Sequence, residues 1–168
     1  MNRWLRILRH RWLDETDAQR ALDEAALQRL TARVQHSESR HSGEIRLCVE
    51  AGLALSYLWR GAPARERALA MFGKLRVWDT ERNNGVLIYL LLAEHAIEIV
   101  ADRGLNRHVT PQRWRELAQG MSASFKASRF EDGLAAAIDA VELLLQQHFP
   151  LAEGAANPNE LPDAPFVG

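Results

Sequence analysis

The chain is expected to fold around residues 83–92, which read NNGVLIYLLL. The opening Asn83, Asn84 and Gly85 tolerate a positive φ and mark a turn. Every residue that follows is apolar, Tyr89 included, so the segment does not alternate between two faces. Such a run is typical of a strand that is covered on both faces, at the centre of a layered α/β sheet.

Two further strands are predicted beside this one. Residues 96–101 follow the short turn 93–95 and return as an antiparallel partner. Residues 43–50 alternate between two faces, which is the period-two pattern of a strand. An amphipathic helix over residues 65–75 connects this strand to the central one, and a connection of that kind joins parallel strands by a right-handed crossover.

Helices are predicted before and after the strands. Helical spacing of apolar residues covers 18–38, and Thr110 with Pro111 begins another helix. Residues 128–131 have capping-box spacing and precede a long amphipathic segment that ends near His148. The expected fold class is therefore α/β: a three-layer sandwich in which a small mixed β-sheet is flanked by helices, with a βαββαα core and additional N-terminal helices.

Composition limits the function further. The chain has 168 residues, 47% of them hydrophobic, and a net charge of −1, which argues against an electrostatic grip on nucleic acid. One cysteine, Cys48, leaves neither an internal disulfide nor a Cys-rich zinc site. No apolar run is long enough to span a bilayer. We expect a basic amphipathic helix at 1–16, a domain at 17–150, and an acidic, Pro-containing tail at 151–168 that is either extended or disordered.

Residues 1–13, MNRWLRILRHRWL, form a short basic amphipathic helix with tryptophans toward its ends. Its apolar side chains fall mainly on one helical face, at Trp4, Leu5, Leu8 and Trp12. Arginines run through the apolar segment and no small-residue cleavage site follows, so the stretch is not a secretory signal. It is suited either to an anionic membrane surface or to packing on the domain or on a second copy.

Six segments, taken in order, carry a family resemblance. They are HSGEI at 41–45, VWDT at 77–80, NNGVLIY at 83–89, EIVADRG at 98–104, FKASRFEDG at 125–133 and HFP at 148–150. In this order they resemble the TPM domain family, in particular its short, signal-less bacterial branch, over roughly residues 20–150. The resemblance implies an α/β sandwich, weak phosphatase activity or divalent-cation binding in some members, and accessory or repair roles in others.

The chain also departs from the family pattern. Secreted members carry a signal peptide and usually a C-terminal transmembrane helix, and neither is expected here. Many members have an acidic residue directly before the Asn-Gly of the second strand, where this chain has the neutral Asn83. The missing carboxylate weakens the transfer of a metal site.

Acidic and amide side chains gather around the start of the central strand. Asp79 and Glu81 precede it, and Asp102 ends its antiparallel partner, so the three are expected at one edge of the sheet. Asn83 and Asn84 would add carbonyl oxygens, giving a weak site for Ca²⁺ or Mg²⁺. In the alternative interpretation these side chains serve only as turn caps, ion-pair partners and backbone shapers.

Three further residues belong to the same candidate site. Glu44 begins its strand beside His41, where a salt bridge is the expected role. Arg82 and Arg103 are suited to holding phosphate. The sequence contains no P-loop, no Cys-x5-Arg, no Gly-x-Ser-x-Gly and no histidine pair with metal-ligand spacing.

Two functions follow from these features. The first is a binding or accessory module in the cytoplasm, at the inner face of the membrane, with an unidentified protein partner and peripheral contact with anionic lipid. The second is a low-turnover phosphatase that depends on a divalent cation, a possibility that rests on the resemblance alone. No cofactor other than the cation is indicated.

Overall fold

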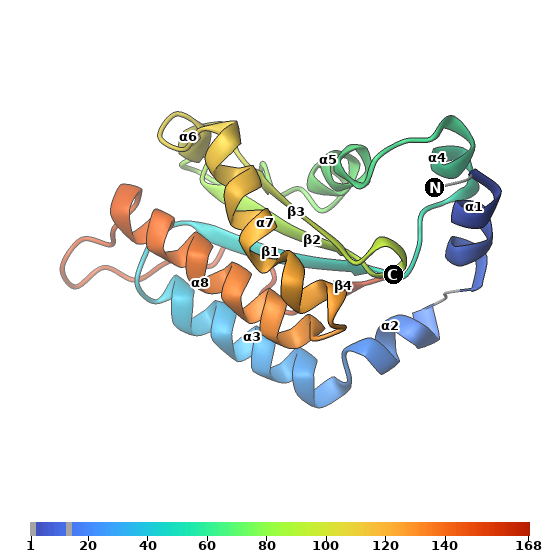
Figure 1. Ribbon diagram of the computed structural model, residues 1–168. Helices are drawn as coiled ribbons and strands as arrows, with labels where there is room; N and C mark the ends of the chain where they lie inside the picture. The colour runs from blue at the N-terminus through green and yellow to red at the C-terminus, as the bar shows by residue number, and fades with distance from the viewer. Residues whose placement is uncertain (1–2, 13–14) are drawn as a thin grey trace.

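The computed structural model describes residues 3–12 and 15–168 and shows a three-layer α/β sandwich (Figure 1). A four-stranded mixed sheet in the order β3-β2-β1-β4 forms the middle layer. The strands are β1 (Glu44–Glu50), β2 (Gly85–Leu91), β3 (Ala96–Ala101) and β4 (Phe166–Val167). β1 pairs in parallel with β2, and β3 is antiparallel to β2, which confirms the predicted strand–helix–strand unit and its hairpin partner.

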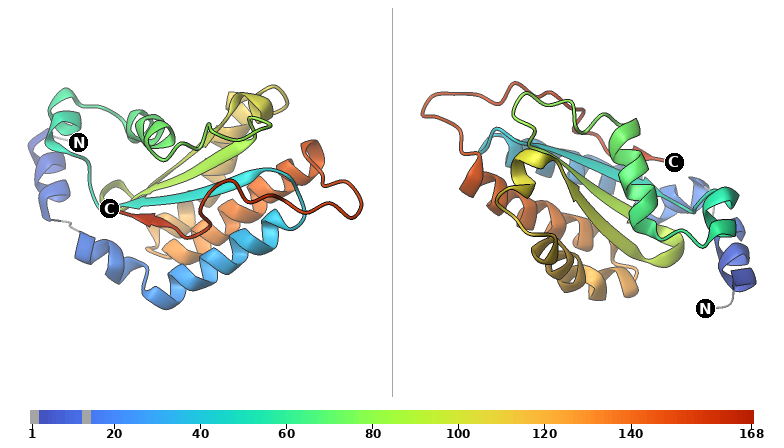
Figure 2. Two further views of the ribbon diagram at one scale, coloured as in Figure 1. Left: turned by 180° about the vertical axis from the view of Figure 1, so that it is seen from behind. Right: turned by 90° about the horizontal axis from the view of Figure 1, so that it is seen from above.

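Helices cover both faces of the sheet, as the two views of Figure 2 show. On one face lie α2 (Glu15–Ala21), α3 (Glu24–Glu38), α7 (Pro111–Lys126) and α8 (Phe130–His148). The other face carries α1 (Arg3–Trp12), α4 (Leu55–Arg60) and α5 (Ala64–Lys74). Two short helices, η1 (Leu92–Glu94) and α6 (Arg103–Asn106), connect the elements around β3. β2 is buried along its whole length between the two layers, as its apolar sequence predicted.

Local hydrogen bonds correct two helix predictions. The single helix expected over 18–38 is two helices, because the Asp23 side chain accepts a bond from the amide of Ala26 at 2.7 Å and begins α3 there. The capping box expected at 128–131 is also wrong. Ser128 has φ 57° and donates its N–H to Phe125 O, so it closes α7, and α8 begins after Arg129 without a side-chain cap.

The C-terminal segment 151–168 takes the extended form and runs back along β1. Its strand β4 pairs in parallel with β1, with Cys48 opposite Phe166. Arg46 of β1 donates to the carbonyl oxygens of Pro162, at 2.6 Å, and of Ala164. The polar face of β1 is therefore covered by this segment and by α5.

None of the helices in the described ranges combines the length and the apolar character needed to cross a bilayer.

Candidate functional site

The start of β2 and the end of β3 meet at one edge of the sheet, as the sequence predicted. Strand register places Val86 opposite Ala101, and the amide of Asp102 donates to Gly85 O at 2.9 Å. The loop before β2 folds onto the same edge, because a Cβ on Gly85 would lie 2.0 Å from Val77 O. Only glycine fits at this approach. We call this edge the strand-end rim.

Asn83 and Arg103 are joined directly at the rim. The Nε of Arg103 donates to Asn83 Oδ1 at 2.8 Å, and the amide of Gly104 donates to Asn83 O at 2.8 Å. A Cβ on Gly104 would come within 2.4 Å of that carbonyl, so the DRG segment requires glycine here. Asn83 has φ 53°, which an asparagine adopts more readily than most residues.

Asn84 is fully buried and tied to the loop before β1. Its backbone N–H donates to Thr80 Oγ1 at 3.1 Å, and its side-chain Nδ2 donates to Ser42 O at 2.8 Å. The Oγ of Ser42 accepts a bond from Arg82 Nη1 at 3.1 Å. Neither Ser42 nor Thr80 was predicted as a site residue, although both lie in segments that carry the family resemblance, HSGEI at 41–45 and VWDT at 77–80.

Two oxygens at the rim accept no hydrogen bond from any residue that the structure describes. Asp102 Oδ1 accepts from the amide of Arg103 at 2.6 Å and caps α6, while its Oδ2 is buried without a partner among the described residues. The Oδ1 of Asn84 is likewise buried and has no partner there. A buried oxygen without a donor costs free energy, so each of these atoms is a candidate for an unseen donor or cation.

The remaining predicted site residues make separate contacts. Asp79 is half exposed and forms an ion pair with Arg76 at 2.6 Å. The backbone amide of Glu81 donates to Glu160 at 2.8 Å. No described contact brings the carboxylate of either residue to Asp102. Within the described ranges, no three His, Cys, Asp or Glu side chains are grouped closely enough to hold a metal ion.

Glu44 contacts the C-terminal segment, and the salt bridge expected for it is not found among the described residues. Its Oε2 accepts from the amide of Leu161 at 3.1 Å, and its Oε1 is buried without a described partner. Burial raises the pKa of this carboxyl, against the effect of the amide bonds that lower it. Glu44 therefore holds the segment 151–168 against β1.

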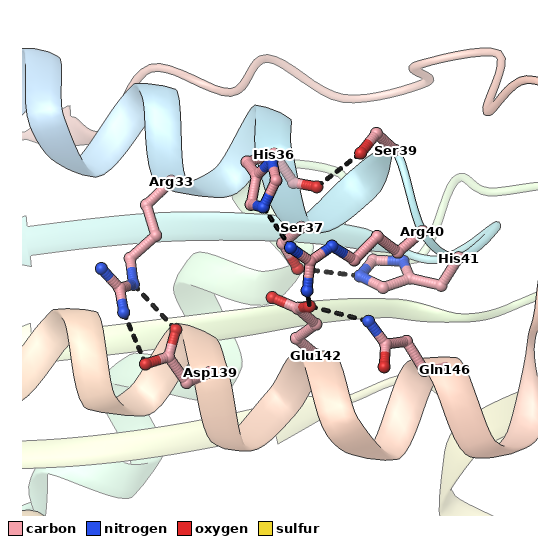
Figure 3. Close-up of polar contacts among 9 residues, drawn as sticks. All are labelled: Arg33, His36, Ser37, Ser39, Arg40, His41, Asp139, Glu142 and Gln146. Atoms are coloured by element: carbon pink, nitrogen blue, oxygen red, sulfur yellow. Dashed lines mark hydrogen bonds and ion pairs between the residues drawn. The ribbon is translucent and has the colours of Figure 1, made fainter.

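His41, beside Glu44 in the sequence, belongs to a buried pair between α3 and the sheet (Figure 3). Its Nε2 lies 2.9 Å from Ser37 Oγ and its Nδ1 lies 3.1 Å from Gly43 O. Burial lowers the pKa of His41 to about 4. Ser37 and His41 are both 0% exposed, so no substrate reaches them.

Around that pair, Arg33 of α3 and Arg40 of the turn that follows α3 bind acids of α8 (Figure 3). Arg33 makes two bonds to Asp139, at 2.8 and 2.6 Å, and Arg40 donates to Glu142 at 2.8 Å and contacts His36. These contacts fasten the two helices together and account for the polar residues in this region.

A second candidate surface lies at the opposite side of the fold, on α1. The helix is fixed to the domain through its polar residues: Arg6 Nε donates to Glu94 at 2.6 Å and its Nη2 donates to Ala62 O at 2.7 Å. The ring of His10 lies 3.1 Å from Glu94 and accepts the amide of Leu53 at 3.0 Å. Four apolar residues face outward, with Trp4 60%, Leu5 61%, Leu8 54% and Trp12 83% exposed, whereas Ile7 packs against the core on the α5 side of the sheet. Leu13, expected on the same stretch, lies outside the described residues.

The comparisons with known proteins agree with this geometry. The family model for the TPM domain matches residues 16–143. The chain is similar to the BA42 protein of the psychrophilic bacterium Bizionia argentinensis, whose structure was determined by NMR. The two match with a TM-score of 0.74 and 26% sequence identity, over 88% of this chain and 95% of BA42. It also shares its fold with the N-terminal domain of a P. gingivalis protein, at a TM-score of 0.62 and 18% identity, over 78% of this chain and 82% of that one. Among curated proteins there is no match. With a family match over most of its length and the strand order and rim described above, the chain belongs to the TPM domain family.

Proposed function

We propose that this protein is a binding module that rests on an anionic membrane surface through α1, at the inner face of the membrane. The observation that carries the proposal is the orientation of α1. An ordinary amphipathic helix buries its apolar stripe in the domain and turns its polar side to water. Here Arg6 and His10 face the domain, and Trp4, Leu8 and Trp12 face outward.

The surface continues beyond α1 onto α4. Trp59 is 61% exposed and meets Trp4 edge to face, with ring centroids 6.4 Å apart, and Leu55 is 52% exposed. We call Trp4, Leu5, Leu8, Trp12, Leu55 and Trp59 the aromatic patch. Indole rings favour the boundary between lipid headgroups and acyl chains, and arginines beside them favour anionic lipid. Arg9 and Arg11 are exposed on the same helix and supply that charge.

Flotation with lipid vesicles tests the proposal. The full chain is expected to float with vesicles that contain phosphatidylglycerol, to float less with pure phosphatidylcholine, and to be released by salt. The double variant Leu8→Ser, Trp12→Ser should stay in solution. Leu143→Ser removes an equally exposed leucine from α8, 67% exposed, and should float like the wild type. Wild-type protein that remains in solution with both vesicle types would contradict the proposal.

A second candidate function is a cation-dependent phosphatase at the strand-end rim. It is favoured by two buried oxygens without described partners, Asn84 Oδ1 and Asp102 Oδ2, beside the guanidinium groups of Arg82 and Arg103. Carboxylate and amide oxygens bind Mg²⁺ or Ca²⁺, and arginines hold phosphate oxygens. The family resemblance supports the same chemistry.

Hydrolysis of p-nitrophenyl phosphate with and without Mg²⁺ tests this second function. Asp102→Asn should abolish any Mg²⁺-dependent rate, whereas Asp139→Asn, on the exposed side of α8, should not change it. Titration with Ca²⁺ and Mg²⁺ should shift the amide resonances of residues 83–85 and 102–104. Equal rates in Asp102→Asn and wild type, together with unmoved resonances, would remove the rim from the mechanism.

A further inference from the structure

A groove of about 650 Å³ runs along the outer edge of β3. β3 ends the sheet order β3-β2-β1-β4, so no strand within residues 3–12 and 15–168 lies on its outer side. α7 runs beside β3 in Figure 1, and residues of α7 together with Arg65 of α5 line the groove. The volume lies within the range of about 300–1,000 Å³ that is usual for ligand-binding pockets.

The β3 backbone in this groove is only partly occupied. Because the amide of Asp102 turns toward β2, alternation turns the backbone groups of Ile97, Ile99 and Ala101 outward. The Ile99 carbonyl accepts from Arg65 at 2.5 Å, and that of Ala101 accepts from Asn106 at 2.6 Å. No hydrogen bond joins the outward N–H or C=O of Ile97 to another described residue. The edge therefore offers a donor and an acceptor at strand spacing.

Apolar side chains line part of the groove. Ile97 and Ile99 contribute from the strand, and Trp114 and Ala118 contribute from α7. Trp114 is fixed in place, because its Nε1 donates to Asn106 Oδ1 at 3.0 Å. The groove thus combines a backbone edge with shallow apolar contacts, which is how domains accept an extended peptide as an added strand.

The charges of the lining favour an acidic occupant. Arg65 already forms an ion pair with Glu98, with 3.5 Å between Nη1 and Oε2. Arg115 is exposed and forms no ion pair among the described residues. Glu98 is the one acid that lines the groove in the part of the chain described. A carboxylate beside the β3 edge would pair with Arg115.

The same charges argue against a second copy as the occupant. Two copies related by a twofold axis would present identical edges to each other. Arg65 and Arg115 of one copy would then lie near those of the other, and like charges at an interface oppose association.

We propose that the β3–α7 groove binds an extended, acidic segment of a partner protein, which joins the sheet beside β3 as a fifth strand. This deepens the binding function proposed above by naming the class of partner. It does not depend on membrane contact, since the groove and the aromatic patch share no residue.

The test is selection of a displayed library of randomised seven-residue peptides on the full chain, without lipid. Three variants are screened in parallel. Ala118→Arg fills the groove, Arg115→Glu reverses its charge, and Arg113→Glu makes the same change two residues earlier on α7, outside the groove. Circular dichroism checks that each variant is folded, and because Arg115 is exposed, its replacement should not affect folding.

The proposal expects enriched peptides with acidic residues among apolar ones. These peptides should bind wild type and Arg113→Glu with the same affinity and bind Arg115→Glu at least about tenfold more weakly. They should not bind Ala118→Arg. In the wild type the bound peptide should shift the amide resonances of Ile97 and Ile99. Absence of enrichment, equal binding to Ala118→Arg, or a dimer formed through β3 would each overturn the proposal. None of these results bears on vesicle flotation, so the two proposals fail separately.

Discussion

His10 and Glu94 join α1 to η1, the short helix after β2, through a hydrogen bond whose direction is fixed. The His10 Nδ1 accepts the amide of Leu53 at 3.0 Å, so its Nε2 carries the proton that is donated to Glu94 Oε1 at 3.1 Å. The same oxygen accepts from Arg6 at 2.6 Å. These bonds lower the pKa of Glu94 and keep it ionised, and the bond from His10 has the largest effect. One carboxylate thus holds the helix whose apolar side faces outward.

His10→Ala should loosen α1 without unfolding the sheet. The substitution leaves the buried amide of Leu53 without its acceptor, which costs about 1–3 kcal/mol of local stability. Hydrogen exchange should therefore accelerate across the α1 amides and not in β2. Arg9→Ala, at an exposed position of the same helix, should leave exchange unchanged. Equal exchange in His10→Ala and wild type would show that α1 is held by other contacts.

The buried carboxylate of Glu50 should make Arg67 a strong determinant of stability. Arg67 binds Glu50 through two bonds of 2.8 and 2.5 Å, and the hydroxyl of the fully buried Tyr89 donates to Glu50 at 2.8 Å. Arg67→Ala leaves that charge buried and unpaired, and should lower the free energy of unfolding by about 3–5 kcal/mol.

Urea denaturation measures this effect against a matched surface pair. Arg60 and Glu66 are an ion pair of 2.6 Å with both side chains substantially exposed, so Arg60→Ala should cost no more than about 1 kcal/mol. Adding Glu50→Gln to Arg67→Ala should restore part of the loss, because the unpaired charge is removed. Similar costs for the two arginines would contradict the role given to burial.

Removal of the C-terminal segment should make Cys48 reactive. The thiol is buried opposite Phe166 of β4, and burial raises its pKa to about 12. A chain ending at residue 160 uncovers this side of β1, and its reaction with a disulfide reagent should accelerate at least about tenfold at pH 8. Arg46→Ala, which removes the bonds to Pro162 and Ala164, should accelerate it less. An unchanged rate in the shortened chain would mean that α5 alone protects the thiol.

The strands could be predicted from the sequence because their signals are local. The continuous apolar run at β2 follows from apolar packing on both faces. The alternation at β1 reflects one apolar face and one polar face, and the polar face is buried as well, under the C-terminal segment and α5. The division of the second predicted helix was missed, although Asp23 is a standard N-cap residue, because apolar spacing continues through it. Ser128 was misread because the same serine that suits a helix start also suits the turn that ends the preceding helix.

The rim was predicted in part. The antiparallel pairing of β2 with β3 brings Asn83, Asn84 and Asp102 to one edge. The apolar run of β2 and the short turn before β3 were sufficient to predict that pairing from the sequence. The contacts of each side chain depend on loop geometry, and Asp79 turns to its neighbour Arg76 for that reason. Neither the two-residue strand β4 nor the buried acids beside it could be predicted from local sequence patterns. Both depend on contact between β1 and the C-terminal segment, which are more than a hundred residues apart in the chain.

Glu38 should make stability fall as pH rises. Its Oε1 accepts the amide of Ile45 at 2.8 Å inside the contact between α3 and the C-terminal segment. Burial raises its pKa to about 9, helped by the negative charges of Glu44 and Asp163 and opposed by the Ile45 bond. Below pH about 4.5 the group is protonated in folded and unfolded chains alike. Above that, the unfolded chain releases a proton that the folded chain keeps, so stability falls until pH about 9.

Glu38→Gln should remove this dependence, because an amide oxygen still accepts the Ile45 bond and carries no charge. Urea denaturation at pH 8 should show the variant more stable than wild type by at least about 1 kcal/mol, the equivalent of one pKa unit, and at pH 4 the difference should vanish. His41 has the opposite effect: its pKa is about 4 in the folded chain, so stability falls as the pH drops below 6.5. Because wild type and Glu38→Gln both contain His41, this effect cancels when the two are compared. Glu153→Gln, at an exposed position of the C-terminal segment, should match wild type at both pH values. A Glu38→Gln chain that is less stable than wild type at pH 8 would show that the carboxylate is ionised in the folded protein.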